Sequence, residues 1–309
     1  MTTNNDFTYH VPVMLQECID GLVINPDGIY VDVTFGGGGH SKAIFEQLSP
    51  KGQLIVFDQD PDARNNAWEA PNFHFVAANF AFLKNHLRVL GFPLVDGILA
   101  DLGVSSHQFD DAKRGFSIRA NEKLDMRMNQ SGDVTAQNIV ATYNEEELAR
   151  IFRAYGELDH PYKTAVELVK ARNKSKIKTT GDLMEALAAV APKFKDHKFF
   201  AQVFQALRIE VNQEMQVLEK FLNQTAEVMK PDARLVVMSY HSLEDRLVKN
   251  MMKRGNLDGT IEKDFFGNVL KPFEEIHRKP ISPSEEEIQR NTRARSAKLR
   301  VAKRSTDAK

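Results

Sequence analysis

A run of four glycines, followed about 20 positions later by an acidic residue, is the first feature of this sequence that could do chemistry. The glycines occupy positions 36–39 after an apolar run, and Asp58 lies 18 positions after His40. Glycines after a strand let the backbone approach a ligand closely, and an acid at the end of the next strand accepts hydrogen bonds from both ribose hydroxyls. The spacing predicts a site for a cofactor that carries a nucleoside.

The glycine run does not complete the G-x-G-x-x-G fingerprint of dinucleotide sites. A template that starts at Gly36 places Ser41 where the third glycine belongs, and one that starts at Gly37 places Lys42 there. That fingerprint brings the backbone close to a pyrophosphate. Its incompleteness favours a cofactor without phosphates and disfavours an NAD-dependent oxidoreductase, an alternative that a cofactor-binding titration would test.

Phe80 and Asp101 stand just beyond two further apolar runs. Phe80 could pack on the face of an adenine, and its simpler role is that of a core aromatic. Asp101 follows the apolar residues 97–100, so its carboxylate is expected to point over the cofactor and not into the core. The alternative for Asp101 is an aspartate that caps a turn.

Strand-like runs that alternate with helical patterns must position these residues. Each run stops at a glycine, aspartate or asparagine, and the alternation indicates βαβ units and a twisted parallel sheet. Ligands bind beyond the carboxyl ends of such strands, where the polar residues fall. The expected strands are residues 29–35, 53–57, 73–77, 97–100 and 234–240, and the expected helices of this part are 13–22, 41–48 and 82–90.

The middle of the chain has the helical period instead. From about residue 135 to 229 the apolar residues recur every 3.6 positions, with Thr180 and Pro192 as start and stop signals. Strand-like sequence resumes at Arg234, and Ser242 with Asp245 has the spacing of a capping box. We therefore predict a sheet domain of residues 1–110 and 216–309 with an inserted helical domain, 111–215, on the substrate side. The expected helices of the insertion are 145–155, 162–172, 181–191 and 199–229.

Charge and cysteine content restrict the partners and the compartment. The formal net charge is only -1, yet residues 290–304 hold seven basic residues and no acid, which predicts either a tail that binds a polyanion or a solvated tail. The single cysteine, Cys18, excludes an internal disulfide and fits a reducing compartment. With no signal-like segment and no apolar run long enough to span a membrane, we expect a cytoplasmic protein.

Six motifs, in order along nearly the whole chain, resemble the bacterial 16S ribosomal RNA (cytosine-N4) methyltransferases. The longest include Asp-Leu-Gly-Val-Ser-Ser, which ends at Ser106, and His-Ser-Leu-Glu-Asp-Arg, which ends at Arg246. The chain departs from the family pattern at Thr292, at Asp232 and Ala233 in place of a Gly-Gly turn, and at Tyr240 in place of phenylalanine. The motifs occupy residues 34–41, 58–61, 96–106, 124–128, 204–212 and 239–246.

The resemblance implies a Rossmann-like class I methyltransferase sheet and S-adenosyl-L-methionine as the cofactor. It implies N4-methylation of a specific cytidine in 16S rRNA of the small ribosomal subunit, with Arg293 and Arg295 as RNA-binding residues. A homodimer is compatible with the sequence. The implied cofactor contacts are Gly38, Gly39, His40, Asp58, Phe80, Asp101 and Gln108.

Asp101 is also the expected catalytic residue. A cytosine amine is a weak nucleophile because its lone pair is delocalised into the ring, so an acceptor for an amine hydrogen would help. Asp101 or a backbone carbonyl within residues 102–105 could be that acceptor, although the resemblance also places Asp101 on the cofactor. The chain lacks the Asp/Asn-Pro-Pro-Tyr/Phe motif of many amino-group methyltransferases. Methylation at C5 would need Cys18 as nucleophile, and its position on one face of a helix favours a buried apolar role.

Other chemistries fit less well. Ser242 lacks a G-x-S-x-G context, which disfavours a hydrolase, and no H-E-x-x-H pattern predicts a metal site. A methyltransferase acting on a DNA base or a protein amine stays open, as does a catalytically silent RNA-binding factor. Cations that could contact RNA phosphates outside the basic tail are Arg114, Arg119, Arg127, Arg150 and Arg153, and aromatics that could stack on an extruded base are Phe109, Phe116 and Tyr240.

Overall fold

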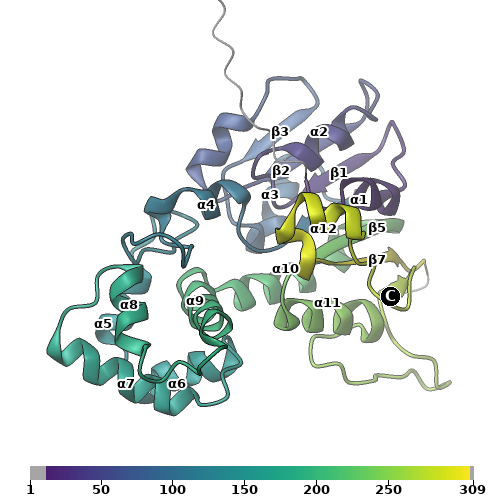
Figure 1. Ribbon diagram of the computed structural model, residues 1–309. Coiled ribbons are helices and arrows are strands. Elements are labelled where there is room, and N and C mark those ends of the chain that lie inside the picture. The colour runs from purple at the N-terminus through teal and green to yellow at the C-terminus, as the bar shows by residue number, and fades with distance from the viewer. Residues whose placement is uncertain (1–11, 307–309) are drawn as a thin grey trace, which may run out of the picture. The chain divides into compact units, whose positions relative to one another are not determined.

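The computed structural model describes residues 12–306 and divides the chain into two compact units (Figure 1). One unit comprises Met1–Gly103 and Leu218–Lys309, and the other is Val104–Val217. The first contains a seven-stranded sheet and the second is built from helices. The predicted fold class, an α/β sheet with an inserted all-helical domain, is confirmed.

The sheet has the strand order β3-β2-β1-β4-β5-β7-β6. The five strands from β3 to β5 run parallel, while β7 runs antiparallel to both β5 and β6. The chain winds outward from β1 in both directions, so the carboxyl ends of β1 and β4 form the topological switch point where such sheets bind ligands. The strands are β1 Ile29–Asp32, β2 Gln53–Phe57, β3 Phe73–Val76, β4 Val95–Asp101, β5 Met229–Ser239, β6 Phe273–Glu275 and β7 Lys298–Arg304.

Both faces of the sheet are covered, because successive residues of a strand point to opposite sides. Tyr30 and Leu99 pack in a cluster with residues of α1 and α2, whereas Val31 and Ile98 pack in a second cluster with residues of α3, α10 and α11. Burial on both faces explains the nearly continuous apolar runs of β2 and β4. The helices are α1 Leu15–Leu22, α2 Gly39–Phe45, α3 Leu83–Val89, α10 Glu214–Val228, α11 Ser242–Arg254 and α12 Glu285–Arg290, with 3-10 turns η1 Pro61–Asn66, η2 Phe80–Phe82 and η4 Thr292–Ser296.

The helical unit has a core of its own. Phe152, Leu168 and Leu207 are buried in one cluster that joins α6, α7 and α9. Four of its helices begin with reciprocal capping boxes, which satisfy backbone N–H groups that the first turn leaves unpaired. The capping residues are Ser105, Thr135, Asn144 and Thr179. The elements are α4 Ser106–Asp110, η3 Ala112–Arg114, α5 Ala136–Thr142, α6 Glu145–Ala154, α7 Pro161–Lys174, α8 Thr180–Leu187 and α9 Asp196–Asn212.

Several helix boundaries differ from those expected, and α8, for example, ends at Leu187 where the predicted helix ran to residue 191. The long helix predicted over residues 199–229 is two helices, because Gln213 adopts a left-handed backbone with φ +51° between α9 and α10. The cap of α8 is Thr179 and not Thr180. The cap of α11 is His241, paired with Glu244, so Ser242 is the first helical residue and the predicted capping role was wrong.

The prediction that the basic residues 290–304 form a tail was also wrong. Residues 298–304 form β7, which pairs with β5 inside the sheet. Arg300 is buried and donates to Asp245 at 2.7 Å, and Lys303 pairs with Asp232 at 3.0 Å. These cations neutralise acids of the same unit, so fewer of them remain to meet a polyanion.

No helix in the described range 12–306 is both long and apolar enough to cross a membrane.

Candidate active site at the carboxyl edge of the sheet

The glycine loop follows β1 directly. Gly38 has a φ of +77°, and a Cβ atom added there would lie 3.0 Å from the ring of Phe35. A Cβ on Gly37 would meet no atom within 4 Å, so the backbone there is open to a ligand. The sequence needs glycine at position 38 for its left-handed conformation, and the open backbone at Gly37 provides the close approach that the pattern predicted.

Asp58, at the end of β2, holds this loop in place. One carboxylate oxygen accepts from the backbone N–H of Gly36 at 2.8 Å, and the other accepts from Asp60 at 2.8 Å. Burial raises the pKa of Asp58 to about 6, and these two backbone hydrogen bonds oppose the rise. A carboxylate has about four acceptor positions, so two remain for a ligand such as a ribose diol.

Asp101 ends β4 and faces two side chains from distant parts of the sheet unit. The Tyr240 hydroxyl donates to its Oδ1 at 2.9 Å, and His40 Nδ1 lies 3.8 Å from its Oδ2. Its side chain is 24% exposed, which leaves a polar opening in an otherwise buried setting. Burial raises the pKa of Asp101 to about 6, while His40 and Tyr240 act to lower it.

His40 is oriented from its far side. Its Nε2 lies 3.0 Å from the carbonyl oxygen of Val13, which can only accept a hydrogen bond. Nε2 therefore carries a hydrogen, and Nδ1 is the atom presented to Asp101. The sequence singled out His40 for the cofactor, and the structure brings it beside the predicted catalytic carboxylate.

A buried scaffold beneath these residues was missed by the sequence analysis. Asp32 is 1% exposed and accepts from the Ser41 hydroxyl at 2.6 Å and from the backbone N–H of Thr34 at 3.0 Å. The Thr34 hydroxyl in turn accepts from the backbone N–H of Asp101 at 2.7 Å. An aspartate closing an apolar strand was the available signal, since buried acids occur mainly where hydrogen bonds satisfy them.

The remaining predicted cofactor residues are less closely grouped. Phe80 is half-buried and packs edge-on against Phe221, with ring centroids 5.3 Å apart. Gln108 belongs to the helical unit, where it is buried and forms a reciprocal capping box with Ser105. The sheet unit therefore holds Gly38, Gly39, His40, Asp58, Phe80 and Asp101 of the predicted set.

Several predicted phosphate-binding arginines serve the protein itself. Arg114 is buried and donates to the carbonyl oxygens of residues 127 and 128. Arg127 binds Asp125 through two nitrogens, and Arg150 pairs with Glu210. Burial contradicts the phosphate contact predicted for Arg114, whereas Arg127 and Arg150 keep exposed surface and their RNA contacts stay predictions. The exposed members of the predicted set are Arg119, Arg150, Arg153, Arg293 and Arg295.

Cys18 is fully buried within α1, as expected for an apolar role. Burial raises the pKa of its thiol well above the usual value, and the nearby carboxylates Asp101 and Glu17 raise it further. A thiol in that setting does not ionise to a nucleophile at neutral pH. The structure therefore disfavours C5 methylation through this cysteine.

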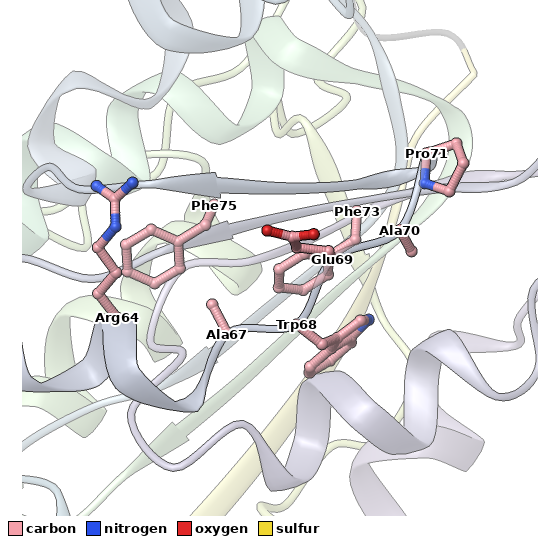
Figure 2. Close-up of a pocket in the computed structure, with 8 residues that line it drawn as sticks. All are labelled: Arg64, Ala67, Trp68, Glu69, Ala70, Pro71, Phe73 and Phe75. Atoms are coloured by element: carbon pink, nitrogen blue, oxygen red, sulfur yellow. The ribbon is translucent and has the colours of Figure 1, made fainter.

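A separate pocket of about 640 Å³ lies along edge strand β3 (Figure 2). Trp68 and Phe73 stack there with ring centroids 4.1 Å apart, and the buried indole N–H of Trp68 has no hydrogen-bond partner among residues 12–306. Phe35, whose ring lies under Gly38, packs against both rings. The pocket thus adjoins the aromatic wall that supports the glycine loop. Its lining residues are Arg64, Ala67, Trp68, Glu69, Ala70, Pro71, Phe73 and Phe75.

The geometry fits a nucleoside-bearing cofactor without phosphates. Acceptors stand where a ribose would need them, the loop is open at Gly37, and Ser41, in place of a third glycine, is tied to Asp32. Residues 7–305 match the model of the MraW methylase family. The chain belongs to this family. It is a methyltransferase, and its cofactor is S-adenosyl-L-methionine.

Relatives match over nearly the full length. The Ribosomal RNA small subunit methyltransferase H of Parabacteroides distasonis is 56% identical and that of Bacteroides thetaiotaomicron 54%, each over 97% of this chain and 98% and 99% of theirs. The solved structure of TrmN from Thermus thermophilus aligns with 94% of this chain and 48% of its own, at 11% identity and a TM-score of 0.40. That likeness is too low to support an argument, and the fold assignment rests on the observed strand order.

Proposed function

We propose that this methyltransferase transfers a methyl group from S-adenosylmethionine to the N4 amine of a specific cytidine in 16S rRNA of the small ribosomal subunit. The observation that carries the proposal is the match over nearly the whole length to proteins named for methylating small-subunit ribosomal RNA. The buried Cys18 supports N4 over C5 as the target atom, because no ionisable thiol is available to attack the ring.

Each cofactor-binding residue has a role that its position supports. Asp58 holds the ribose hydroxyls with the acceptor positions that the loop leaves open, and Gly38 and Gly39 let the backbone approach the cofactor. Phe80 contacts the adenine, and Gln108 contributes from the helical unit. The bound cofactor supplies the methyl group on a sulfonium that an in-line lone pair attacks.

Asp101 accepts the proton that the amine loses. When the amine nitrogen bonds to the methyl carbon, the nitrogen must lose one proton, and an ionised carboxylate within hydrogen-bond reach accepts it. The raised pKa of Asp101, about 6, leaves it ionised at neutral pH and makes it a stronger base than an ordinary aspartate. The Tyr240 hydroxyl holds Oδ1, so Oδ2, on the side of His40, is the oxygen that receives the proton.

RNA contacts come from exposed cations. Arg293 and Arg295 are exposed in η4 and contribute phosphate contacts, and the helical unit serves the substrate side. We also propose the cytoplasm as the location and the small subunit as the partner. A homodimer is compatible with the sequence, and sedimentation of the purified protein tests it.

Transfer of labelled methyl from S-adenosylmethionine to small subunits lacking the modification tests the proposal, with the product identified by nucleoside mass spectrometry. Label in N4-methylcytidine supports it, and label in 5-methylcytidine overturns the choice of atom. If the cofactor binds and no subunit RNA is labelled, the ribosomal substrate is wrong. Labelling of free DNA or of a protein amine under the same conditions would support the alternative substrate classes.

A further inference from the structure

The segment between α8 and α9 carries the most exposed aromatic side chain of the helical unit's described residues. Phe194 is 100% exposed. It lies between Lys193 and Lys195, with Lys198 one turn into α9, and all three lysines are exposed. An aromatic ring left wholly in water adds no free energy of burial to the fold. Folding of this unit therefore does not explain its position, and an interaction with another molecule would.

The backbone at Phe194 is held in an unfavourable conformation. Its φ is +64°, in the left-handed region that bulky residues rarely occupy. A backbone hydrogen bond from Lys195 N–H to the Pro192 carbonyl, 3.1 Å long, closes the turn around it. Strained residues of this kind cluster at ligand-binding and active sites, so the angle at Phe194 points to a functional role for this turn.

The charge of the segment is positive and unneutralised. Asp196 is the one acid among residues 192–198, against three lysines. None of these lysines forms an ion pair within the part of the chain that the structure describes, residues 12–306. Cations at the start of a helix are also unfavourable for that helix, because its dipole is positive there. The lysines thus destabilise the start of α9 slightly while giving the surface around the ring a positive charge.

A hollow lies beside the ring. It measures about 460 Å³ and is lined by Ala188, Ala191, Pro192, Lys193, Phe194, Asp196 and the buried Phe200. A flat, apolar group that stacks on Phe194 would have this recess next to it, and a negative group would meet the lysines. Nucleotides combine both properties, since every base has an apolar face and every linkage a negative phosphate.

We propose that the segment 192–198 is a binding surface for single-stranded RNA, in which Phe194 stacks on an unpaired base and Lys193, Lys195 and Lys198 contact the adjoining phosphates. The inference rests on the proposed RNA substrate and adds a contact surface in the helical unit. The positive charge of the segment favours a polyanion as the ligand. The exposed ring favours single-stranded over double-stranded RNA, because only unpaired bases are free to stack on it.

Two substitutions of Phe194 separate binding from folding. Phe194→Ala and Phe194→Gly both remove the ring, and glycine also relieves the strained φ. The expected result is an approximately tenfold weaker affinity in both variants for a fluorescein-labelled single-stranded RNA of about 12 nucleotides. The glycine variant should melt above the alanine variant and above the wild type. Phe194→Tyr keeps a stacking ring and should bind as the wild type does.

The lysines are tested by salt dependence. Lys193→Ala combined with Lys195→Ala should lower the slope of log affinity against log salt by about 1.4, which is two phosphate contacts on a single strand. Lys163→Ala combined with Lys170→Ala, on α7 of the same unit, removes the same charge and should leave the slope nearly unchanged. A slope that falls equally in both pairs would show a general charge effect and overturn the proposal.

The remaining outcomes are also decisive. Wild-type affinity in Phe194→Gly overturns the stacking role, as does equal loss of affinity for single-stranded and fully paired RNA. If the variants bind free RNA normally and lose affinity only for whole small subunits, the surface recognises protein. If the wild-type protein neither binds nor methylates RNA, the proposed function itself fails, and that result is distinct from the loss of Phe194 binding in an active enzyme.

Discussion

Asp58 and Asp101 at strand ends of the sheet unit and Asp125 in the helical unit lie in opposite electrostatic environments. In the sheet unit, Asp58 and Asp101 are desolvated at strand ends, and burial raises the pKa of each to about 6. In the helical unit, Asp125 is partly buried as well, yet hydrogen bonds from Arg127 keep its pKa below the usual value. Desolvated acids that cost stability are typical of reactive sites, whereas paired acids are typical of scaffolding.

The largest expected effect is the loss of methyl transfer when the desolvated acid Asp101 of the sheet unit is replaced. Asp101→Asn should lower methyl transfer by about 100-fold or more, because the amide cannot accept the amine proton, while the melting temperature at neutral pH does not fall. Turnover and thermal unfolding of the same preparation measure both. Asp20→Asn, an exposed position on α1, serves as the control and should stay fully active. Near-normal turnover in Asp101→Asn would remove its catalytic role.

The helical side should respond to loss of a paired cation by unfolding. Arg114→Met leaves the two carbonyl oxygens of residues 127 and 128 without their buried donor, which should cost about 3 kcal/mol of unfolding free energy. Urea denaturation measures the loss. Arg119→Met, at an exposed position of the same unit, should change stability by less than about 0.5 kcal/mol. An equal response of the two variants would contradict the structural role of Arg114.

The pH dependence of stability sharpens the contrast, because the signs differ. The folded pKa of Asp101 is raised from the usual 3.8 to about 6, so its contribution is complete below the usual pKa and is lost as the pH rises through about 6. The wild type should therefore lose about 3 kcal/mol relative to Asp101→Asn between a pH below the usual pKa and neutral pH. The folded pKa of Asp125 is lowered, so its contribution is present at neutral pH and is lost on acidification.

Unfolding free energies of the wild type, Asp101→Asn and Asp125→Asn across that range test both signs. Asp125→Asn should be the less stable partner at neutral pH and approach the wild type in acid. The same trend in both variants would mean that the two acids do not differ in environment as described.

The smallest expected effect concerns one strained residue in the sheet unit. Asp232 has a φ of +64° at the position where the family resemblance predicts a Gly-Gly turn, and its carboxylate pairs with Lys303. Asp232→Gly relieves the backbone and loses the exposed ion pair, for a net gain of about 0.5 kcal/mol. Asp232→Ala loses the pair and keeps the strain, so it should be less stable than the wild type. Thermal unfolding of both variants decides, and a glycine variant below the alanine variant would rule out backbone strain.

Local pattern determined which residues end the strands of this protein. The glycine run, Asp58 and Asp101 follow apolar segments, and a parallel sheet brings such ends to one edge, so the fold class and the place of these residues at that edge could be read from the chain. The helical insertion was equally readable from its period of 3.6 residues. These are short-range signals, and burial on one or both faces enforces them.

Tertiary structure alone decided which charges and hydroxyls are available. Tyr240 reaches Asp101 across 139 positions of sequence, and Arg300 reaches Asp245 across 55. No spacing rule predicts such pairs, because they depend on which strands become neighbours. The basic stretch was therefore expected to be a tail, whereas its residues 298–304 form an internal strand of the sheet. Phe194 carried no sequence signal until its exposure and backbone angle were seen.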